Sequence, residues 1–181
     1  MEDFTGPELR SRRLLLTPFR RIEADALLTV FRDAGVRRYL LDDLEVSRQW
    51  VLAEIDASAA RFRENGAGLW TARLSRDGEI IGFGGFREFF DPPQLQLLYG
   101  LLPGHWGQGL ATEMAVRLCR QGFAGLGFRT IRAATDAPNH ASIRVLEKLG
   151  MRRTDSTPAD DATVFFALDR QDAGPDLVAG E

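Results

Sequence analysis

The chain of 181 residues contains little cysteine, lysine or histidine. Its one cysteine, Cys119, cannot form an intramolecular disulfide, and this fits a reducing compartment. The two histidines, His105 and His140, do not form a metal-ligand spacing with that cysteine, so we predict no metal site. Lys148 is the only lysine and lies in a predicted helical, exposed segment, so we discard a Schiff-base mechanism.

Long apolar runs and strong net charge are also missing. No run approaches the ~20 residues that cross a bilayer, and the first residues are acidic where a signal peptide is basic. We therefore expect a cytoplasmic protein without membrane contact. The net charge of -3 gives no sign of nucleic-acid binding. Arg10, Arg12 and Arg13 form a small basic cluster that we interpret as a solvated strand end.

The length suits one compact domain, and 44% of the residues are apolar, as in ordinary globular proteins. We predict a single domain over residues 8–170, with flexible termini at 1–7 and 171–181. Hydrophobic spacing predicts strands over 13–19, 69–74, 79–86, 95–102, 129–135 and 162–168. It predicts helices over 23–32, over 47–64, from about 110 to 124, and between 139 and 150. This order predicts an α/β fold, a mixed sheet with helices on both faces.

The sharpest local feature is a glycine turn, Gly107-Gln108-Gly109, between a central strand and a helix start. Glycines let the backbone approach a ligand, and free N–H groups at a helix start bind phosphate. A tight turn that uses glycine only for its geometry remains an alternative. Thr112 stands where the Rossmann pattern needs a third glycine, and a Walker lysine is absent. The glycines of 82–85 lie inside a predicted strand, where they favour a bend or close packing.

Several segments together resemble the GNAT superfamily of N-acetyltransferases, and specifically its RimJ/RimL-like branch. The turn and its flank, Gly104 to Gly109, resemble the family's pyrophosphate loop, Gln/Arg-x-x-Gly-x-Gly/Ala, except that Gly104 has no side chain. The segments HWGQGLATE and APNHASIRVLEKLGM are similar to this branch, as is RLLLTPFRRIEADALLTVF near the start. The resemblance covers about residues 12 to 169.

The resemblance implies acetyl-CoA as co-substrate and a cleft between two splayed parallel strands, here 95–102 and 129–135. Backbone groups near Leu101 and Leu102 would pair with the pantetheine arm of the cofactor. Asn139 would hydrogen-bond the cofactor, and helix N-capping is an alternative or additional role. The pyrophosphate would lie on His105, Trp106, Gly107, Gln108, Gly109, Leu110, Ala111 and Thr112.

Family resemblance also implies catalytic roles. Ser142, which we count among the cofactor contacts as well, would donate a proton to the leaving thiolate, although a residue so close to a helix start also suits capping. A backbone N–H near Leu98 or Tyr99 would polarise the carbonyl. Tyr99 occupies the general location of the proton donor in many other GNAT branches, but strand alternation could also direct it into the core.

The general base is the open question. Many relatives carry glutamate where this chain has Gln96, and an amide cannot take a proton. Glu88, or Asp160 and Asp161, could replace it. Alternatively the acceptor is an α-amine, whose pKa of about 8 leaves a useful fraction neutral without a base, whereas a lysine amine with a pKa near 10.4 is almost wholly charged. A third alternative is a module that binds acyl-CoA without turnover.

These considerations predict transfer to a primary amine, with the α-amine of a protein or peptide N-terminus favoured. A small polycationic amine, such as a polyamine or aminoglycoside, is the alternative acceptor. The carboxylates that would bind such a polycation could come from the loop 155–161, or from Asp42, Asp43 and Glu45. Dimerisation is common in the branch that this chain resembles, so a homodimer is a further implication of the resemblance, and the sequence does not decide it.

Overall fold

The computed structural model describes residues 6–40, 43–154 and 162–179, and within them eight strands form one mixed sheet. Their spatial order is β1-β2-β3-β4-β5-β6-β8-β7, and only the pair β5 and β6 is parallel. The strands are β1 (Leu9–Arg10), β2 (Leu15–Pro18), β3 (Leu69–Arg73), β4 (Gly82–Phe89), β5 (Gln94–Leu101), β6 (Thr130–Asp136), β7 (Arg152–Thr154) and β8 (Thr163–Asp169).

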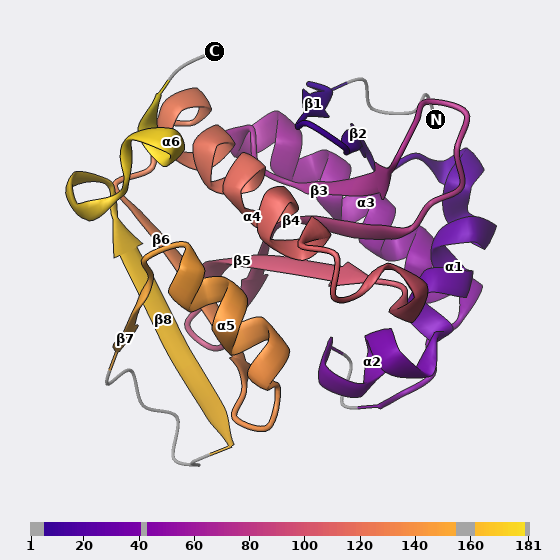
Figure 1. Ribbon diagram of the computed structural model, residues 1–181. Coiled ribbons are helices and arrows are strands. Elements are labelled where there is room, and N and C mark those ends of the chain that lie inside the picture. The colour runs from indigo at the N-terminus through magenta and orange to yellow at the C-terminus, as the bar shows by residue number, and fades with distance from the viewer. Residues whose placement is uncertain (1–5, 41–42, 155–161, 180–181) are drawn as a thin grey trace.

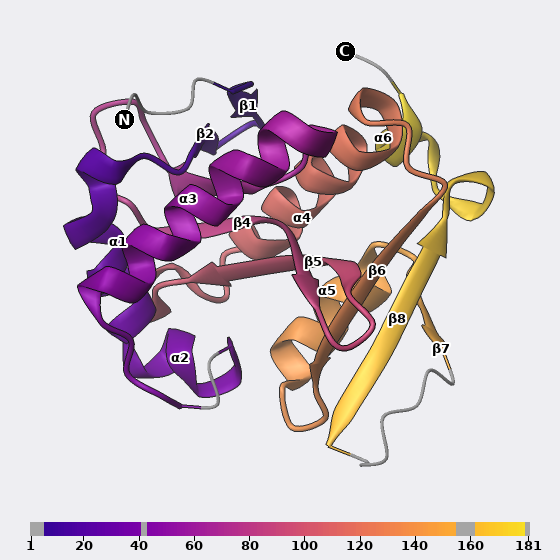
Figure 2. The same ribbon diagram turned by 180° about the vertical axis from the view of Figure 1, so that it is seen from behind.

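Helices cover both faces of the sheet (Figures 1 and 2). One face packs against α1 and α3, and the other against α4 and α5, with a separate hydrophobic cluster on each. The helices are α1 (Ala24–Arg32), α2 (Ala34–Leu40), α3 (Arg48–Asn65), α4 (Leu110–Arg120), α5 (His140–Lys148) and α6 (Pro175–Val178). The predicted fold class, a mixed sheet with helices on both faces, is therefore confirmed. No helix in the described ranges is long and apolar enough to cross a membrane.

The ends of α3 show how local sequence sets the elements. The Ser47 hydroxyl accepts a hydrogen bond from the Trp50 N–H at 3.1 Å, which satisfies a donor that a helix start leaves open. Gly66 ends the helix in a left-handed conformation, with φ of 74°. Both the predicted start and the predicted stop are thus confirmed.

The glycine-rich start of β4 serves close packing, as predicted. A Cβ atom on Gly85 would lie 2.1 Å from the Gly68 carbonyl oxygen, and one on Gly82 would lie 2.2 Å from the Gly100 oxygen. Neither distance leaves room for a methyl group, so both strands beside β4 can approach it only because these residues lack side chains.

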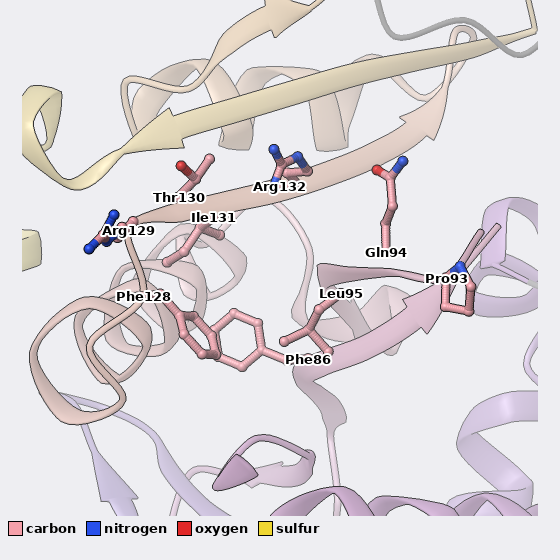
Figure 3. A pocket seen from close by; sticks show the side chains of 9 residues that line it. All are labelled: Phe86, Pro93, Gln94, Leu95, Phe128, Arg129, Thr130, Ile131 and Arg132. Atoms are coloured by element: carbon pink, nitrogen blue, oxygen red, sulfur yellow. The ribbon is translucent and has the colours of Figure 1, made fainter. Parts of the chain in front are cut away.

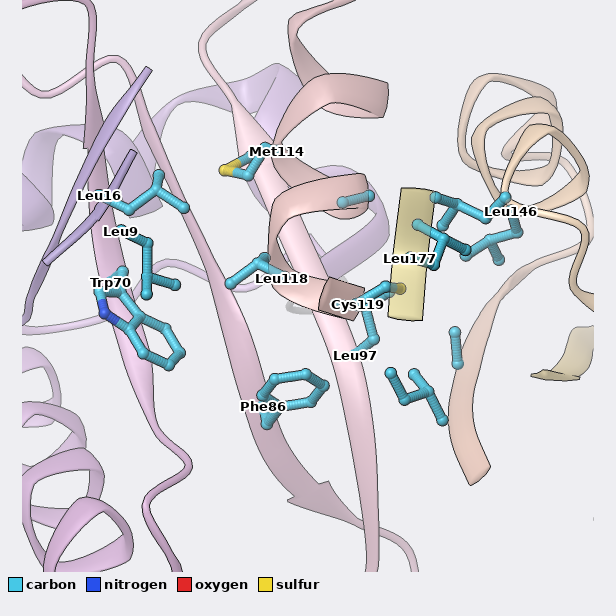
Figure 4. Close-up of a cluster of buried hydrophobic side chains, with 14 of the residues drawn as sticks. Leu9, Leu16, Trp70, Phe86, Leu97, Met114, Leu118, Cys119, Leu146 and Leu177 are labelled. Atoms are coloured by element: carbon cyan, nitrogen blue, oxygen red, sulfur yellow. The ribbon is translucent and has the colours of Figure 1, made fainter. Parts of the chain in front are cut away.

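Helix α4 contributes the centre of the larger core, where Met114, Leu118 and Cys119 are fully buried (Figure 4). The cysteine is therefore a core thiol, and its spacing from Met114 and Leu118 in the sequence is typical of one buried helix face. The C-terminal part, expected to be loose, instead contains α6. Leu177 of this helix is 5% exposed and belongs to the same core, because it covers the α4 surface near Cys119.

The sequence interpretation missed α2. This helix has only seven residues, and its one fully buried side chain is Val36, so it shows little periodic signal. A capping signal was present, since the Asp33 carboxylate accepts hydrogen bonds from the N–H groups of Gly35 and Val36. The omission matters because α2 forms one wall of the site described below.

Strands β5 and β6 touch at one point only. Their register consists of the single pair Gln96 and Arg132, and Figures 1 and 2 show the strands running apart at an angle. The predicted splay of two parallel strands is present, and it opens the sheet next to the glycine turn.

Candidate active site

A cavity of about 380 Å³ occupies the opening between β5 and β6. Its walls come from both strands, from the glycine turn with the start of α4, from α5 and from α2. Every predicted cofactor residue lines it except Leu102 and Gln108, and so do the predicted catalytic residues Tyr99 and Ser142. The structure thus brings together nearly all of the residues that the sequence singled out.

The backbone of β5 presents hydrogen-bonding groups to this cavity at alternate residues. The Leu102 N–H donates to the Ile81 carbonyl on the β4 side, so it does not face the opening. Because backbone direction alternates along a strand, Leu98 faces β4 as well, and Tyr99 and Leu101 face β6. Of the two backbone donors considered for carbonyl polarisation, only the Tyr99 N–H therefore points into the opening.

Trp106 closes the end of this strand edge. Its indole N–H donates to the Leu101 carbonyl at 2.6 Å, while the ring remains half exposed. The same ring packs on α2, where a Cβ atom on Gly35 would lie 2.8 Å from it. The tryptophan thus connects the glycine turn to the helix on the opposite wall.

The turn itself has the geometry of an anion cradle. Gly107 and Gly109 both adopt left-handed backbone conformations, with φ of 72° and 76°, and Gly107 has no atom near its would-be Cβ. Leu110 begins α4 directly afterwards, so the free N–H groups and the positive end of the helix dipole lie at the mouth of the cavity.

A pair of hydroxyl groups lies deeper in the cavity. The Tyr99 and Ser142 hydroxyl oxygens are 3.1 Å apart, and the Tyr99 hydroxyl also lies 3.3 Å from the Ser142 carbonyl oxygen. Burial raises the pKa of the Tyr99 hydroxyl well above its usual range, and the hydrogen bond with Ser142 offsets part of that rise. The tyrosine therefore remains protonated at physiological pH.

Asn139 begins α5 and orients the serine. Its side-chain oxygen accepts a hydrogen bond from the Ser142 N–H at 3.2 Å, which is the N-capping role considered for it. The cap fixes the first turn of the helix and with it the direction of the Ser142 side chain toward Tyr99. Asn139 itself lines the cavity, so capping leaves it within reach of a ligand.

The candidate bases are not gathered in the cavity. Glu88 is exposed and does not line it, and Asp160 and Asp161 lie outside the described residues. Gln96 is 2% exposed, and its amide oxygen has no hydrogen-bond partner among the described residues. It points to the α3 face, because it lies directly opposite Arg87, whose guanidinium binds the buried carboxylate of Glu54.

The charged residues of the cavity wall are all basic. Arg144 and Lys148 of α5 line it, and none of the described lining residues is an aspartate or glutamate. Asp43 and Glu45, considered as partners of a polycation, are exposed and pair with Arg37 instead. An anionic ligand suits these walls better than a polycationic one.

A second cavity, of about 320 Å³, lies at the other side of the contact between β5 and β6 (Figure 3). Phe86 and Phe128 pack edge to face there, beside Arg132 of β6 and Arg129, which directly precedes that strand. It has neither the glycine turn nor the hydroxyl pair, so we place the chemistry in the larger cavity.

Residues 13–152 match the family described as an acetyltransferase (GNAT) domain. The chain therefore belongs to the GNAT acetyltransferase family. It is also 30% identical over 149 residues to the N-acetyltransferase YoaA of Bacillus subtilis (strain 168), covering 81% of this chain and 84% of that protein. The protein is accordingly an acetyl-CoA-dependent acetyltransferase.

Solved structures agree with this fold. A crystal structure of an acetyltransferase from Agrobacterium tumefaciens superposes on this acetyltransferase with a TM-score of 0.79 at 24% identity, covering 94% of this chain and 98% of that one. RimL, the ribosomal L7/L12 alpha-N-protein acetyltransferase in complex with coenzyme A, superposes with a TM-score of 0.73 at 14% identity, covering 90% and 98%. At these identities the structures support the fold alone.

Proposed function

We propose that this acetyltransferase transfers the acetyl group of acetyl-CoA to the α-amine of a protein or peptide N-terminus, as a RimJ/RimL-like enzyme. The observation that carries the proposal is the meeting of the Tyr99 and Ser142 hydroxyls inside a cavity that ends on the glycine turn. Acetyl transfer requires a proton donor for the thiolate and an anchor for the cofactor, and the cavity offers both.

In the proposed complex, the pyrophosphate lies on the turn Gly107 to Gly109 and the start of α4. The pantetheine arm follows the open edge of β5, where Tyr99 and Leu101 face the cavity. Arg144 and Lys148 add positive charge to the wall along which an anionic cofactor would lie. RimL, which has the same fold, is described in complex with coenzyme A.

The chemistry then proceeds by direct transfer. The neutral amine attacks the thioester carbonyl carbon, and the Tyr99 N–H stabilises the negative charge that develops on the carbonyl oxygen. As the carbon–sulfur bond breaks, the Ser142 hydroxyl gives its proton to the thiolate and takes a proton back from water. The new amide nitrogen loses its extra proton to water, so the enzyme returns to its starting protonation state. Tyr99, whose pKa is raised by burial, stays protonated and holds the Ser142 hydroxyl in place.

Two observations favour an α-amine as acceptor. Gln96 cannot act as a base, and no carboxylate of the described residues lines the cavity. At pH 7 about 10% of an α-amine with a pKa near 8 is neutral, compared with about 0.04% of a lysine amine. An enzyme without a strong base therefore favours the α-amine, and the basic wall disfavours a polyamine or aminoglycoside.

A pair of matched peptides tests the acceptor. One has a free N-terminus and no lysine, and the other has an acetylated N-terminus and one lysine. We expect kcat/KM for the first to exceed that for the second by at least about tenfold at pH 7, because its neutral fraction is larger. A clear preference for the lysine peptide, measured by release of free coenzyme A, would refute an α-amine acceptor.

A further inference from the structure

Arg13 contacts the glycine turn through Gln108, and neither residue lines the cavity. One guanidinium nitrogen, Nη1, donates to the Gln108 carbonyl at 3.0 Å, and Nε donates to the Glu113 carboxylate at 2.7 Å. This arginine belongs to the link between β1 and β2, about a hundred residues from the turn in sequence. The interpretation of Arg13 as part of a solvated strand end is therefore wrong, whereas Arg10 and Arg12 are exposed.

Glu113 holds the arginine in this position. Its carboxylate accepts hydrogen bonds from the Arg13 N–H, from the Arg13 guanidinium and from the Ser11 hydroxyl, each at 2.7 Å. The carboxylate is 17% exposed and the arginine side chain 37%. Because the partly buried carboxylate accepts three hydrogen bonds, it holds the arginine in a defined position.

The contact with Gln108 sets the direction of one peptide group in the turn. The carbonyl of Gln108 and the N–H of Gly109 belong to the same planar trans peptide, so they point in opposite directions. Because Arg13 binds the carbonyl from outside, the Gly109 N–H points the other way. Gly109 lines the cavity and Gln108 does not, which agrees with this orientation.

The ion pair also neutralises a negative charge close to the turn. Glu113 lies in the first turn of α4, and an unpaired carboxylate there would repel an anion bound at the helix start. Arg13 neutralises it. Partial burial acts to raise the pKa of Glu113, but the hydrogen bonds from Ser11 and Arg13 together outweigh it and lower that pKa, so the pair remains ionised at neutral pH.

We infer that Arg13 is a positioning residue for the cofactor's pyrophosphate: it fixes the Gly107–Gly109 turn from behind, so that the Gly109 N–H is already directed at the phosphate before binding. Preorganised donors bind anions more tightly than donors that must be reoriented. The inference rests on the proposed binding of coenzyme A at this turn.

The test is calorimetric binding of coenzyme A, dephospho-coenzyme A and pantetheine to the full chain and to Arg13→Gln. We expect Arg13→Gln to weaken binding of the first two by about tenfold each, as for the loss of one charged hydrogen bond, and to leave pantetheine unchanged because it lacks the pyrophosphate. Arg12→Gln is the matched control, since it removes the same charge from the neighbouring exposed position, and it should bind all three ligands as the unmodified chain does.

Arg13→Lys keeps the charge but cannot make both hydrogen bonds in the same geometry, so its affinity for coenzyme A should lie between those of the unmodified chain and Arg13→Gln. It replaces Arg13→Gln in the test if that variant does not fold. Equal weakening for pantetheine would indicate a general structural role and overturn the inference. A loss confined to coenzyme A would indicate direct contact with the 3′-phosphate and would overturn it too. Unchanged binding by Arg13→Gln overturns the inference alone, whereas an unmodified chain that does not bind coenzyme A overturns the proposed function with it.

Discussion

At the scale of single residues, the proposed active site depends on two hydroxyl groups from distant parts of the chain. Tyr99 is on β5 and Ser142 is on α5, and the structure places their oxygens 3.1 Å apart. From the sequence each was a separate candidate for the proton donor. Their contact suggests instead that they act as a pair, with tyrosine orienting serine.

Cys119 illustrates a residue whose role the sequence predicted well. Its helical spacing with Met114 and Leu118 indicated a core position, and the side chain is fully buried. Burial raises the pKa of its thiol to about 12, so the reactive thiolate is scarce below pH 10.

We therefore expect the folded chain to react with a thiol reagent such as DTNB at least about a hundredfold more slowly than the unfolded chain at pH 8. Absorbance at the wavelength of the released thiolate, recorded with and without denaturant, measures both rates. Rapid modification of the folded protein would show that Cys119 is accessible, contrary to its position under α6.

At the scale of elements, a strand, turn and helix together form the proposed cofactor anchor. Most of this unit was predictable from sequence, because glycine at positions 107 and 109 and the apolar run before them are local signals. Its support was not, because Arg13 and Glu113 are a hundred residues apart in the sequence. Helix α2 was also missed, since its seven residues carry little periodic signal and its place follows from packing on β5.

Two glycine substitutions distinguish close packing from an open turn. Gly85→Ala should destabilise the chain by at least about 3 kcal/mol, because its Cβ would lie 2.1 Å from a backbone oxygen and the residue has φ of 150°. Gly104→Ala is the matched control: no atom lies within 4 Å of its would-be Cβ, so its stability should remain unchanged.

Chemical denaturation of both variants, followed by circular dichroism, provides the comparison. Similar midpoints for the two would contradict the close approach of β4 to the strand beside it.

At the scale of the whole molecule, the candidate active-site cavity is a consequence of how the sheet is built. Helices on both faces hold β5 and β6 in one sheet, yet the strands pair only at Gln96 and Arg132 and then separate. The order of the elements predicted a mixed sheet, whereas the splay of its parallel pair was expected only through family resemblance. Hydrophobic patterns identify strands but do not determine the angle between them, which depends on the packing of α4 and α5.

The sequence did not identify which groups act on the acceptor amine. The candidate base Glu88 lies away from the cavity because β4 carries it beyond the point where β5 and β6 meet. Gln96 lies at that point, buried, with its amide oxygen unpartnered among the described residues. Neither position could be read from local spacing, because each depends on the register of the sheet.

The central claim is that the cavity between β5 and β6 transfers an acetyl group with Ser142 as the final proton donor. The measurement that tests it most directly compares turnover with cofactor binding in Ser142→Ala. Removing a positioned acid should lower kcat by about a hundredfold, while the dissociation constant for coenzyme A changes by less than about threefold. Ser47→Ala is the control, since it removes the same hydroxyl from the α3 cap, costs about 1 kcal/mol of stability and should leave kcat unchanged. A Ser142→Ala enzyme with undiminished kcat, or one whose loss of activity matches its loss of cofactor binding, would contradict the account.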